Sequence, residues 1–175
     1  MTTHVSIFSM IKSDDRGYLT SQLFAYSSKS LPAIEIIGMG KRGKIIKEKI
    51  IYWLKKRNIR LSSKRYVICL ETFQRLNFDD EESVRWLELP SLMLLLVLGD
   101  VLEVSNIDHC FCAGNLGLEG NYFFPSEQLN IEKVENDFCE KNFILITHQQ
   151  KTNFLINKAD KILDFEDVLV HLKKP

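Results

Sequence analysis

The chain has 175 residues, which is enough for one domain with a substantial apolar core and too few for two domains of ordinary size. Its 23 Lys and Arg residues balance its 23 Asp and Glu residues, and 45% of all residues are hydrophobic. This composition excludes a fully disordered chain, a collagen-like chain and a small protein held together by disulfides.

No stretch supplies the roughly 20 consecutive apolar residues that a membrane span needs. The longest apolar stretch, residues 89–98, contains Pro90 and Ser91. Residues 1–10 lack the basic region and sustained apolar core of a secretory signal. The four cysteines are scattered, which favours reduced thiols. We therefore expect a cytoplasmic protein with no membrane contact.

The first half of the chain predicts a hairpin, a strand, a helix and a strand. Residues 5–10 and 18–26 alternate partly between apolar and polar around the turn-like residues 13–17, which is typical of a hairpin. Residues 33–37 are apolar and β-branched, which predicts a buried strand. A helix over residues 44–57 follows from a stripe of apolar residues at helical spacing, and residues 66–70 predict a second buried strand. That stripe consists of Ile46, Ile50, Trp53 and Leu54.

The second half alternates short helices and strands. We expect an acidic loop over residues 74–86, then a hydrophobic helix over 89–102 with Pro90 in its first turn. Short strands are expected at 110–113, at 122–124 running antiparallel after a turn, and at 143–147. Helices are expected over 131–140 and 165–172. The pattern predicts a mixed α/β (α+β) fold with one domain over residues 1–175.

The balanced total charge conceals a strongly basic segment. Eleven Lys and Arg residues lie between Lys41 and Arg65, and only Glu48 opposes them. Such a segment indicates either an anionic partner, with nucleic acid as the first candidate, or simply the solvated face of one helix. The residues we expect to contact DNA or an acidic partner are Lys41, Arg42, Lys44, Lys47, Arg57 and Arg60.

A glycine motif opens the predicted helix. Gly38, Gly40 and Gly43 follow the strand at 33–37 in the GxGxxG pattern of dinucleotide-binding loops. Three features weigh against that interpretation. About 30 residues precede the unit, the acid Glu71 comes 28 residues after Gly43 rather than about 20, and no second strand–helix–strand unit is apparent later. Nucleotide binding stays an alternative to a plain tight turn, and we expect no cofactor.

The cysteines and the aromatic residues of the second half are expected to pack in the core. His109, Cys110, Cys112 and Cys139 contain no CxxC pair, so buried thiols explain them and no metal site is expected. The aromatic residues 122–124 could stack on nucleic-acid bases, but aromatics in a short strand more often belong to a core.

Several segments carry a family resemblance. They are LPAIEIIGM (31–39) with the helix after it, RYVICL (65–70), ELPSL (88–92), GNLGLEG (114–120), and FILI (143–146) with residues 159–172. In this order they resemble the N-terminal Lon-protease-like domain of the ComM/YifB family, which is related to magnesium-chelatase ATPase subunits. The resemblance extends from about residue 5 to 172. It implies the Lon-like fold, that of the second domain of ribosomal small-subunit protein five.

Two departures from that family bear on function. Its members carry an AAA+ ATPase module, whereas these 175 residues contain no GxxxxGK[ST] loop for ATP phosphates. Lon-type proteolysis uses a Ser–Lys dyad, and the corresponding positions fall near Arg85 or Trp86 and near Asn130, which cannot perform it. An offset dyad of Ser91 and Lys133 is the catalytic alternative.

The sequence therefore predicts a catalytically inactive Lon-like domain that acts as an oligomerisation or interaction module. Its expected partners are a second copy of itself, a separate AAA+ ATPase or DNA, in DNA processing, recombination or transformation. A diverged Ser–Lys peptidase and a nucleotide-binding module remain the alternatives.

Overall fold

The computed structural model describes residues 3–71, 80–102, 104, 106–125, 129–138, 141–148, 155 and 158–170. In chain order, the elements are β1 (Thr3–Ser13), β2 (Gly17–Ser28), β3 (Ala33–Ile37), α1 (Gly40–Lys56), β4 (Arg65–Glu71), α2 (Glu81–Val84), the 3-10 turn η1 (Arg85–Leu87), α3 (Glu88–Leu98), β5 (Cys110–Cys112), β6 (Asn115–Leu116), β7 (Tyr122–Phe123), α4 (Glu132–Asp137), β8 (Ile144–Thr147), β9 (Lys161–Asp164) and α5 (Phe165–Val170).

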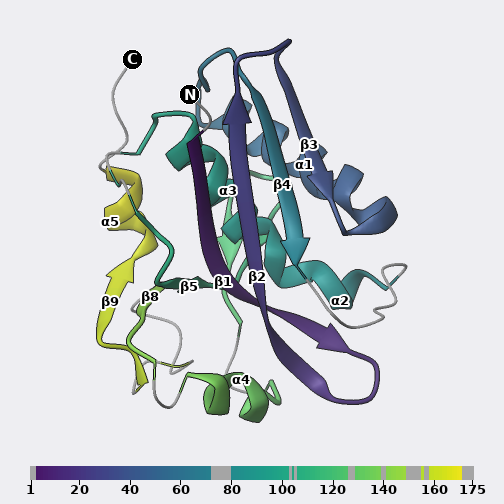
Figure 1. Cartoon of the computed structure of the whole chain (residues 1–175), viewed down its shortest axis with the longest axis vertical. Helices are drawn as coiled ribbons and strands as arrows, with labels where there is room; N and C mark the ends of the chain where they lie inside the picture. Colours follow the sequence, from purple (N-terminus) through teal and green to yellow (C-terminus); the bar gives the residue numbers. More distant parts are fainter. Residues whose placement is uncertain are drawn as a thin grey trace.

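Seven strands form one mixed sheet in the order β3-β4-β2-β1-β5-β8-β9. Strand β2 runs antiparallel to both of its neighbours, and the other neighbouring pairs are parallel. Helices α1 and α3 cover one face of the sheet, while α4 lies at the lower end in Figure 1. Strands β6 and β7 form a separate antiparallel hairpin. The expectation of a mixed α/β fold is confirmed.

The β1–β2 hairpin is the longest paired unit of the sheet. Its register joins Ser13 to Gly17 across a short turn, and Gly17 has φ +72°, which glycine adopts without strain. Alternate residues such as Ile7 and Leu23 are paired and fully buried on the helix side. The predicted hairpin is confirmed.

Helix α1 packs on the sheet through the predicted apolar stripe. Ile46, Ile50, Trp53 and Leu54 are all buried. The helix begins at Gly40, earlier than expected, because the glycine turn lets it start close to the sheet. Gly38 has φ +86°, and a Cβ there would lie 2.9 Å from the carbonyl oxygen of Leu70. A Cβ on Gly43 would lie 3.1 Å from the carbonyl oxygen of Ile36.

Helix α3 is the central buried helix. Every residue from Glu88 to Leu98 is buried, and Pro90 lies in the first turn, where its missing N–H is harmless. The helix ends at Leu98, before the predicted residue 102, because Gly99 caps it and Asp100 turns the chain with φ +58°.

Several predictions for individual elements are wrong. Strand β3 is half-buried rather than buried because it lies at the edge of the sheet, with β4 on one side only. Residues 81–84 form α2 instead of a loop, since the Asp80 carboxylate accepts the Glu82 N–H and caps that turn. Residues 85 and 86 of the predicted loop belong to η1, and residues 74–79 lie outside the described residues.

The C-terminal half differs from its prediction in connectivity. Strands β5 and β8 are parallel neighbours with α4 between them in sequence, so a second strand–helix–strand unit does exist. Strand β9 was not anticipated. Helix α4 (Glu132–Asp137) is shorter than the predicted 131–140. The remaining strands and α5 lie where they were expected, as far as the described residues reach.

The sheet separates two cores. The larger lies on the side of α1 and α3, and the smaller gathers on the opposite face around Phe111, Phe138 and Phe143. These three rings contact one another edge to face or tilted, with centroids 4.7–6.5 Å apart.

None of the helices in the described part of the chain has both the length and the apolar character that crossing a membrane requires.

The same substitution on the two faces of α1 tests this packing. Ile50→Ala should lower the free energy of unfolding by about 2–5 kcal/mol, because it opens a cavity at a fully buried position. Ile45→Ala, at a position with 44% exposure, should change it by about 1 kcal/mol or less. Urea unfolding followed by circular dichroism measures both. Equal destabilisation by the two variants would contradict the described orientation of α1.

Candidate functional site: the outer face of helix α1

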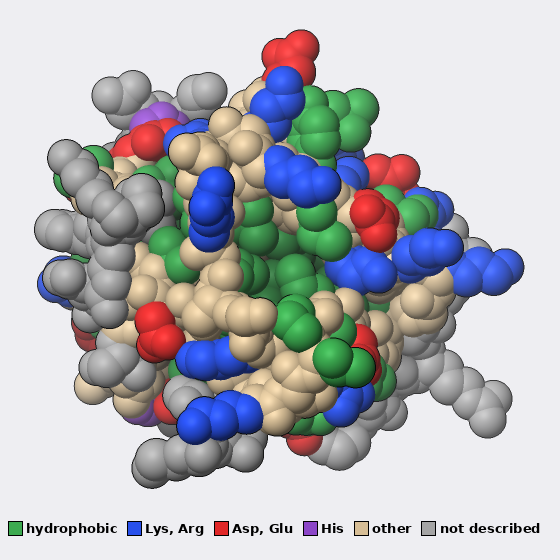
Figure 2. Space-filling model, turned by 90° about the horizontal axis from the view of Figure 1, so that it is seen from above, with side chains coloured by type: hydrophobic (Ala, Val, Ile, Leu, Met, Phe, Trp, Pro, Cys, Tyr) green, Lys and Arg blue, Asp and Glu red, His purple; other side chains and the backbone are tan. Residues whose placement is uncertain are grey.

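Large apolar side chains are exposed on the outer face of α1 and on the turn next to it. Ile45 and Tyr52 of α1 are 44% and 41% exposed, and Leu118 in the β6–β7 hairpin is 75% exposed. Together they line an open groove of about 600 Å³, with Lys44 and Lys55 also on its walls. Seen from above, the molecule presents a hollow of apolar side chains with Lys and Arg side chains around it (Figure 2).

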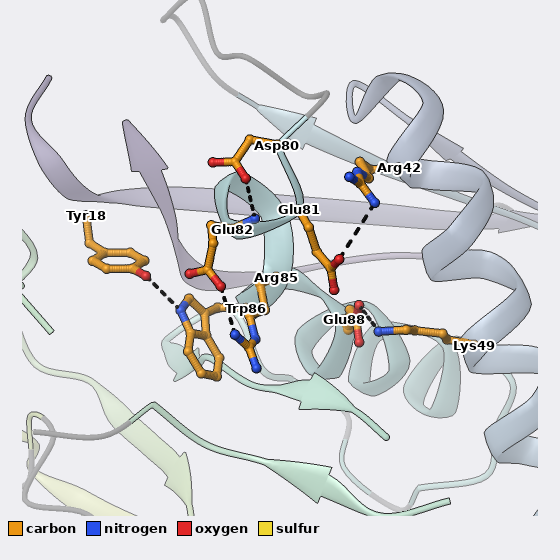
Figure 3. Close-up of polar contacts among 9 residues, drawn as sticks. All are labelled: Tyr18, Arg42, Lys49, Asp80, Glu81, Glu82, Arg85, Trp86 and Glu88. Atoms are coloured by element: carbon orange, nitrogen blue, oxygen red, sulfur yellow. Dashed lines mark hydrogen bonds and ion pairs between the residues drawn. The ribbon is translucent and has the colours of Figure 1, made fainter. Parts of the chain in front are cut away.

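A buried carboxylate holds the two walls of this groove together. Glu88, the first residue of α3, is 4% exposed. Its Oε1 accepts a bond of 2.7 Å from Lys49 Nζ of α1 (Figure 3), and its Oε2 accepts the Leu116 N–H of the hairpin at 2.8 Å. One side chain therefore ties α1, α3 and the β6–β7 hairpin to each other.

The surroundings of Glu88 act on its pKa in opposite directions. Burial is the largest influence and raises the pKa of this carboxyl above its usual range. The hydrogen bonds from Lys49 and Leu116 and the charge of Lys49 oppose that rise, while the charge of Glu81 adds to it. The net direction is upward, so the buried charge is not fully compensated.

Arg57 provides the second link between α1 and the hairpin. Its guanidinium donates a bond of 3.4 Å to the carbonyl oxygen of Gly120 and lies 4.9 Å from the centre of the Trp53 ring. Gly120 has φ +82°, and a Cβ there would be 3.3 Å from Lys56 Cβ. The hairpin turn is therefore packed against the C-terminal half of α1.

The fold neutralises part of the basic segment internally. Lys49 is paired with Glu88, Lys64 with Asp100 at 3.0 Å, and Arg65 with Glu35 at 2.8 Å. Arg42 lies 4.0 Å from Glu81, and Lys47 lies 3.7 Å from Glu48. The segment is thus less available to a partner than its sequence indicates.

The six basic residues singled out from the sequence fall into different environments. Lys41, Lys44 and Arg60 are exposed and form no ion pair with any described residue. Arg42 and Lys47 are in the ion pairs just given, and Arg57 holds the hairpin. Lys55, also exposed without an ion pair among the described residues, was missed. Its helical phase could have identified it, because 11 residues are close to three turns and place it on the side of Lys44.

The glycine motif has a structural explanation. Gly38 and Gly43 are required by the turn and by close packing, as described above. The carboxylate of Glu81 points toward Arg42 in the first turn of α1 (Figure 3), while Lys41 and Lys44 of the same helix end are exposed.

The offset dyad residues lie apart. Ser91 is fully buried in α3, and its hydroxyl donates a bond of 2.7 Å to the carbonyl oxygen of Leu87, the last residue of η1. Lys133 is exposed on α4, and the two side chains form no hydrogen bond with each other. A serine whose hydroxyl is bonded to the preceding turn and closed to solvent cannot attack a peptide.

Cys110 and Cys112 belong to the core. Burial raises the pKa of the Cys110 thiol to about 11 and also raises the pKa of the Cys112 thiol well above its usual value, so both are protonated and poor ligands. Cys139 lies outside the described residues. Within the described part of the chain no group of three His, Cys, Asp or Glu residues could hold a metal. Tyr122 packs on Phe165, with centroids 4.7 Å apart, but Phe123 is 50% exposed, so the expectation that these aromatics belong to a core is wrong for Phe123.

One histidine–carboxylate pair was not predicted from the sequence. His148 Nδ1 lies 3.1 Å from Asp164 Oδ2, at the ends of the parallel strands β8 and β9. Asp164 also accepts the Glu166 N–H at the start of α5. The signal for this pair was the parallel register of β8 and β9, which could not be recognised without strand β9.

Two other surfaces expose apolar side chains. A cavity of about 720 Å³ is lined by Phe8 and Phe138, and Lys141 Nζ lies 5.7 and 5.6 Å from the centres of these rings, as Lys56 Nζ lies 5.4 Å from the centre of the Tyr52 ring on α1. On the sheet face opposite α1, Phe24 and Ile37 are exposed beside the internally neutralised Arg65–Glu35 pair. The outer face of α1 combines exposed apolar side chains with lysines that no described acid neutralises.

No known protein-family model matches the chain, and a search of curated proteins finds no significant match.

The raised pKa of Glu88 predicts a specific pH dependence of stability. Between the ordinary glutamate pKa of about 4.3 and its raised value, the folded state binds more protons than the unfolded state. Stability from this group is therefore complete below that interval and is lost as the pH rises through it. Urea unfolding of wild type and Glu88→Gln should show the free-energy difference, wild type minus variant, falling as the pH increases. A difference that rises or stays constant would contradict the assignment.

Ser91→Ala should leave the protein almost unchanged. The Leu87 carbonyl keeps its backbone partner in the helix, so the free energy of unfolding should change by about 1 kcal/mol or less. In a test with labelled casein, neither Ser91→Ala nor Lys133→Ala should reduce the rate of hydrolysis below that of the wild-type protein. Casein cleavage abolished by both substitutions would instead support the peptidase alternative.

Proposed function

We propose that this chain is a non-catalytic Lon-like domain of the ComM/YifB type that works as an interaction module, and that it engages an anionic partner through the outer face of α1. The observation that carries the proposal is the coexistence, on that face, of exposed apolar side chains with lysines that form no ion pair among the described residues.

The order of the elements supports the Lon-like part of the proposal. Residues 31–39 and 65–70, which carry the start of the resemblance, include β3 and β4, and α1 lies between them. The ELPSL segment opens α3, GNLGLEG forms the β6 side and turn of the hairpin, and FILI overlaps β8. Residues 159–170 hold β9 and α5. Each segment that carries the resemblance thus coincides with a helix, strand or turn of this chain, which is what the proposal requires.

The non-catalytic part is supported by the burial of Ser91. Its hydroxyl has no access to a substrate, and its bond to Leu87 leaves it facing its own backbone. The positions that correspond to the family dyad, near Arg85 or Trp86 and Asn130, carry no nucleophile or base. The fold would then be retained as a scaffold for binding.

The proposed partners follow from the positive charge that α1 exposes. Lys41, Lys44 and Lys55 project from one helix without ion pairs among the described residues, so an anionic surface could replace solvent there at low desolvation cost. A second copy of this chain, a separate AAA+ ATPase with an acidic surface, or DNA would each provide such charge. A cytoplasmic role in DNA processing fits any of the three.

Binding to a polyanion tests the charged face directly. We expect a short fluorescein-labelled DNA duplex to bind with an affinity that falls steeply between about 50 and 200 mM salt. The triple variant Lys41→Glu, Lys44→Glu, Lys55→Glu should weaken binding by about tenfold or more. It should also lower the salt slope by about one for each phosphate that the protein no longer neutralises. Fluorescence anisotropy measures both quantities.

The matched control reverses three other exposed lysines. Lys29→Glu, Lys133→Glu, Lys161→Glu gives the same net charge on β9, α4 and the loop before β3. It should retain most of the wild-type affinity. Equal weakening by the two triple variants would mean that only net charge matters, and binding that does not depend on salt would refute the proposed face.

A further inference from the structure

We propose that the groove between α1 and the β6–β7 hairpin takes an amphipathic helix with an acidic flank, supplied by a protein partner. This inference rests on the proposed function, since it names the chemistry of the partner at the same face. It commits to an acidic protein segment rather than to nucleic acid.

The apolar part of the groove has the spacing of a helix-binding site. Ile45 and Tyr52 are seven residues apart on α1, which is about 10 Å along the helix axis. A partner helix lying beside α1 presents apolar side chains at i, i+3 or i+4, and i+7, which span the same length. Leu118 lies across the groove on the hairpin and closes the other side.

The apolar side chains also discriminate between partner classes. Nucleic acids bind mainly through phosphate contacts with Lys and Arg, and such contacts make no use of exposed Ile, Tyr and Leu side chains. A protein helix buries them, and burial contributes about 25 cal/mol per Å² of apolar surface. The groove therefore favours a protein segment over a duplex.

The charges at the rim define the polar flank of the partner. Lys44 and Lys55 lie on the same side of α1, close to three turns apart. Glu48 lies between them and is 3.7 Å from Lys47, so acidic partner residues are expected opposite the two lysines and not at the centre. Lys49, although it lines the groove, is bound to Glu88 and offers little further charge.

The groove is also preorganised. Glu88 fixes its two walls through Lys49 and Leu116, and Arg57 holds the hairpin turn through Gly120. Less ordering is then needed when a partner binds, which favours affinity. Because the Glu88 and Arg57 contacts lie beneath or beside the groove, surface variants at Leu118 can be tested without removing them.

A displayed library of random peptides of about 14 residues, roughly four helical turns, provides an unbiased probe. We expect the enriched peptides to combine large apolar residues at helical spacing with acidic residues on one side. Their affinity, measured by fluorescence anisotropy, should fall about tenfold or more with Leu118→Ser, and also with the pair Lys44→Glu, Lys55→Glu. Ile37→Ser, at another exposed apolar position, and Lys133→Glu are the controls and should have little effect.

The outcomes separate this inference from the proposed function. Enriched peptides that lack acidic residues, or that bind the Leu118→Ser variant as well as wild type, would overturn the inference. A selection that yields no binder would also overturn it, while the proposed function would stand if duplex binding still depends on Lys41, Lys44 and Lys55. Failure of both the peptide and the duplex experiments would remove both proposals.

Discussion

The arrangement of the candidate site depends on one buried carboxylate. Glu88 lies at the start of a helix that is buried along its whole length, and it bonds a lysine of α1 and a backbone N–H of the β6–β7 hairpin. Breaking a buried pair by removing one partner commonly destabilises a protein by about 3–5 kcal/mol, whereas replacing both partners with apolar residues is often neutral. The pair is therefore better understood as fixing the position of the hairpin beside α1 than as a large source of stability.

The basic residues between Lys41 and Arg65 fall into two groups: some form contacts within the fold, and others are exposed without an ion pair among the described residues. Three of the basic residues form ion pairs with acids elsewhere in the chain and help to position α1 and β4: Lys49, Lys64 and Arg65. Arg57 donates a hydrogen bond to the turn of the β6–β7 hairpin. Lys41, Lys44 and Lys55 have no such partner among the described residues. The same helix therefore packs on the sheet through its apolar stripe and presents these three lysines with Ile45 and Tyr52 on its other side.

Local patterns were enough to predict the elements that depend on local spacing. The stripe from Ile46 to Leu54 identified the buried face of α1, and the alternation around the turn at Gly17 identified the hairpin. The edge position of β3 and the parallel pairing of β5, β8 and β9 depend on which strands meet in space, which periodicity does not encode. The same holds for the site: the basic residues were visible in the sequence, but the burial of Glu88 and the approach of Leu118 to α1 arise from contacts between distant segments.

The outer face of α1 is the surface at which we propose that a partner binds. The most direct test of this proposal is a titration of the isotope-labelled protein with a short heparin oligosaccharide, followed by amide chemical shifts in NMR spectra. The changes are expected to concentrate on the amides of Lys41, Lys44 and Lys55 of α1 and their neighbours in the helix. Changes concentrated on α4 or on the open face of β3 and β4, with α1 unaffected, would contradict the proposal.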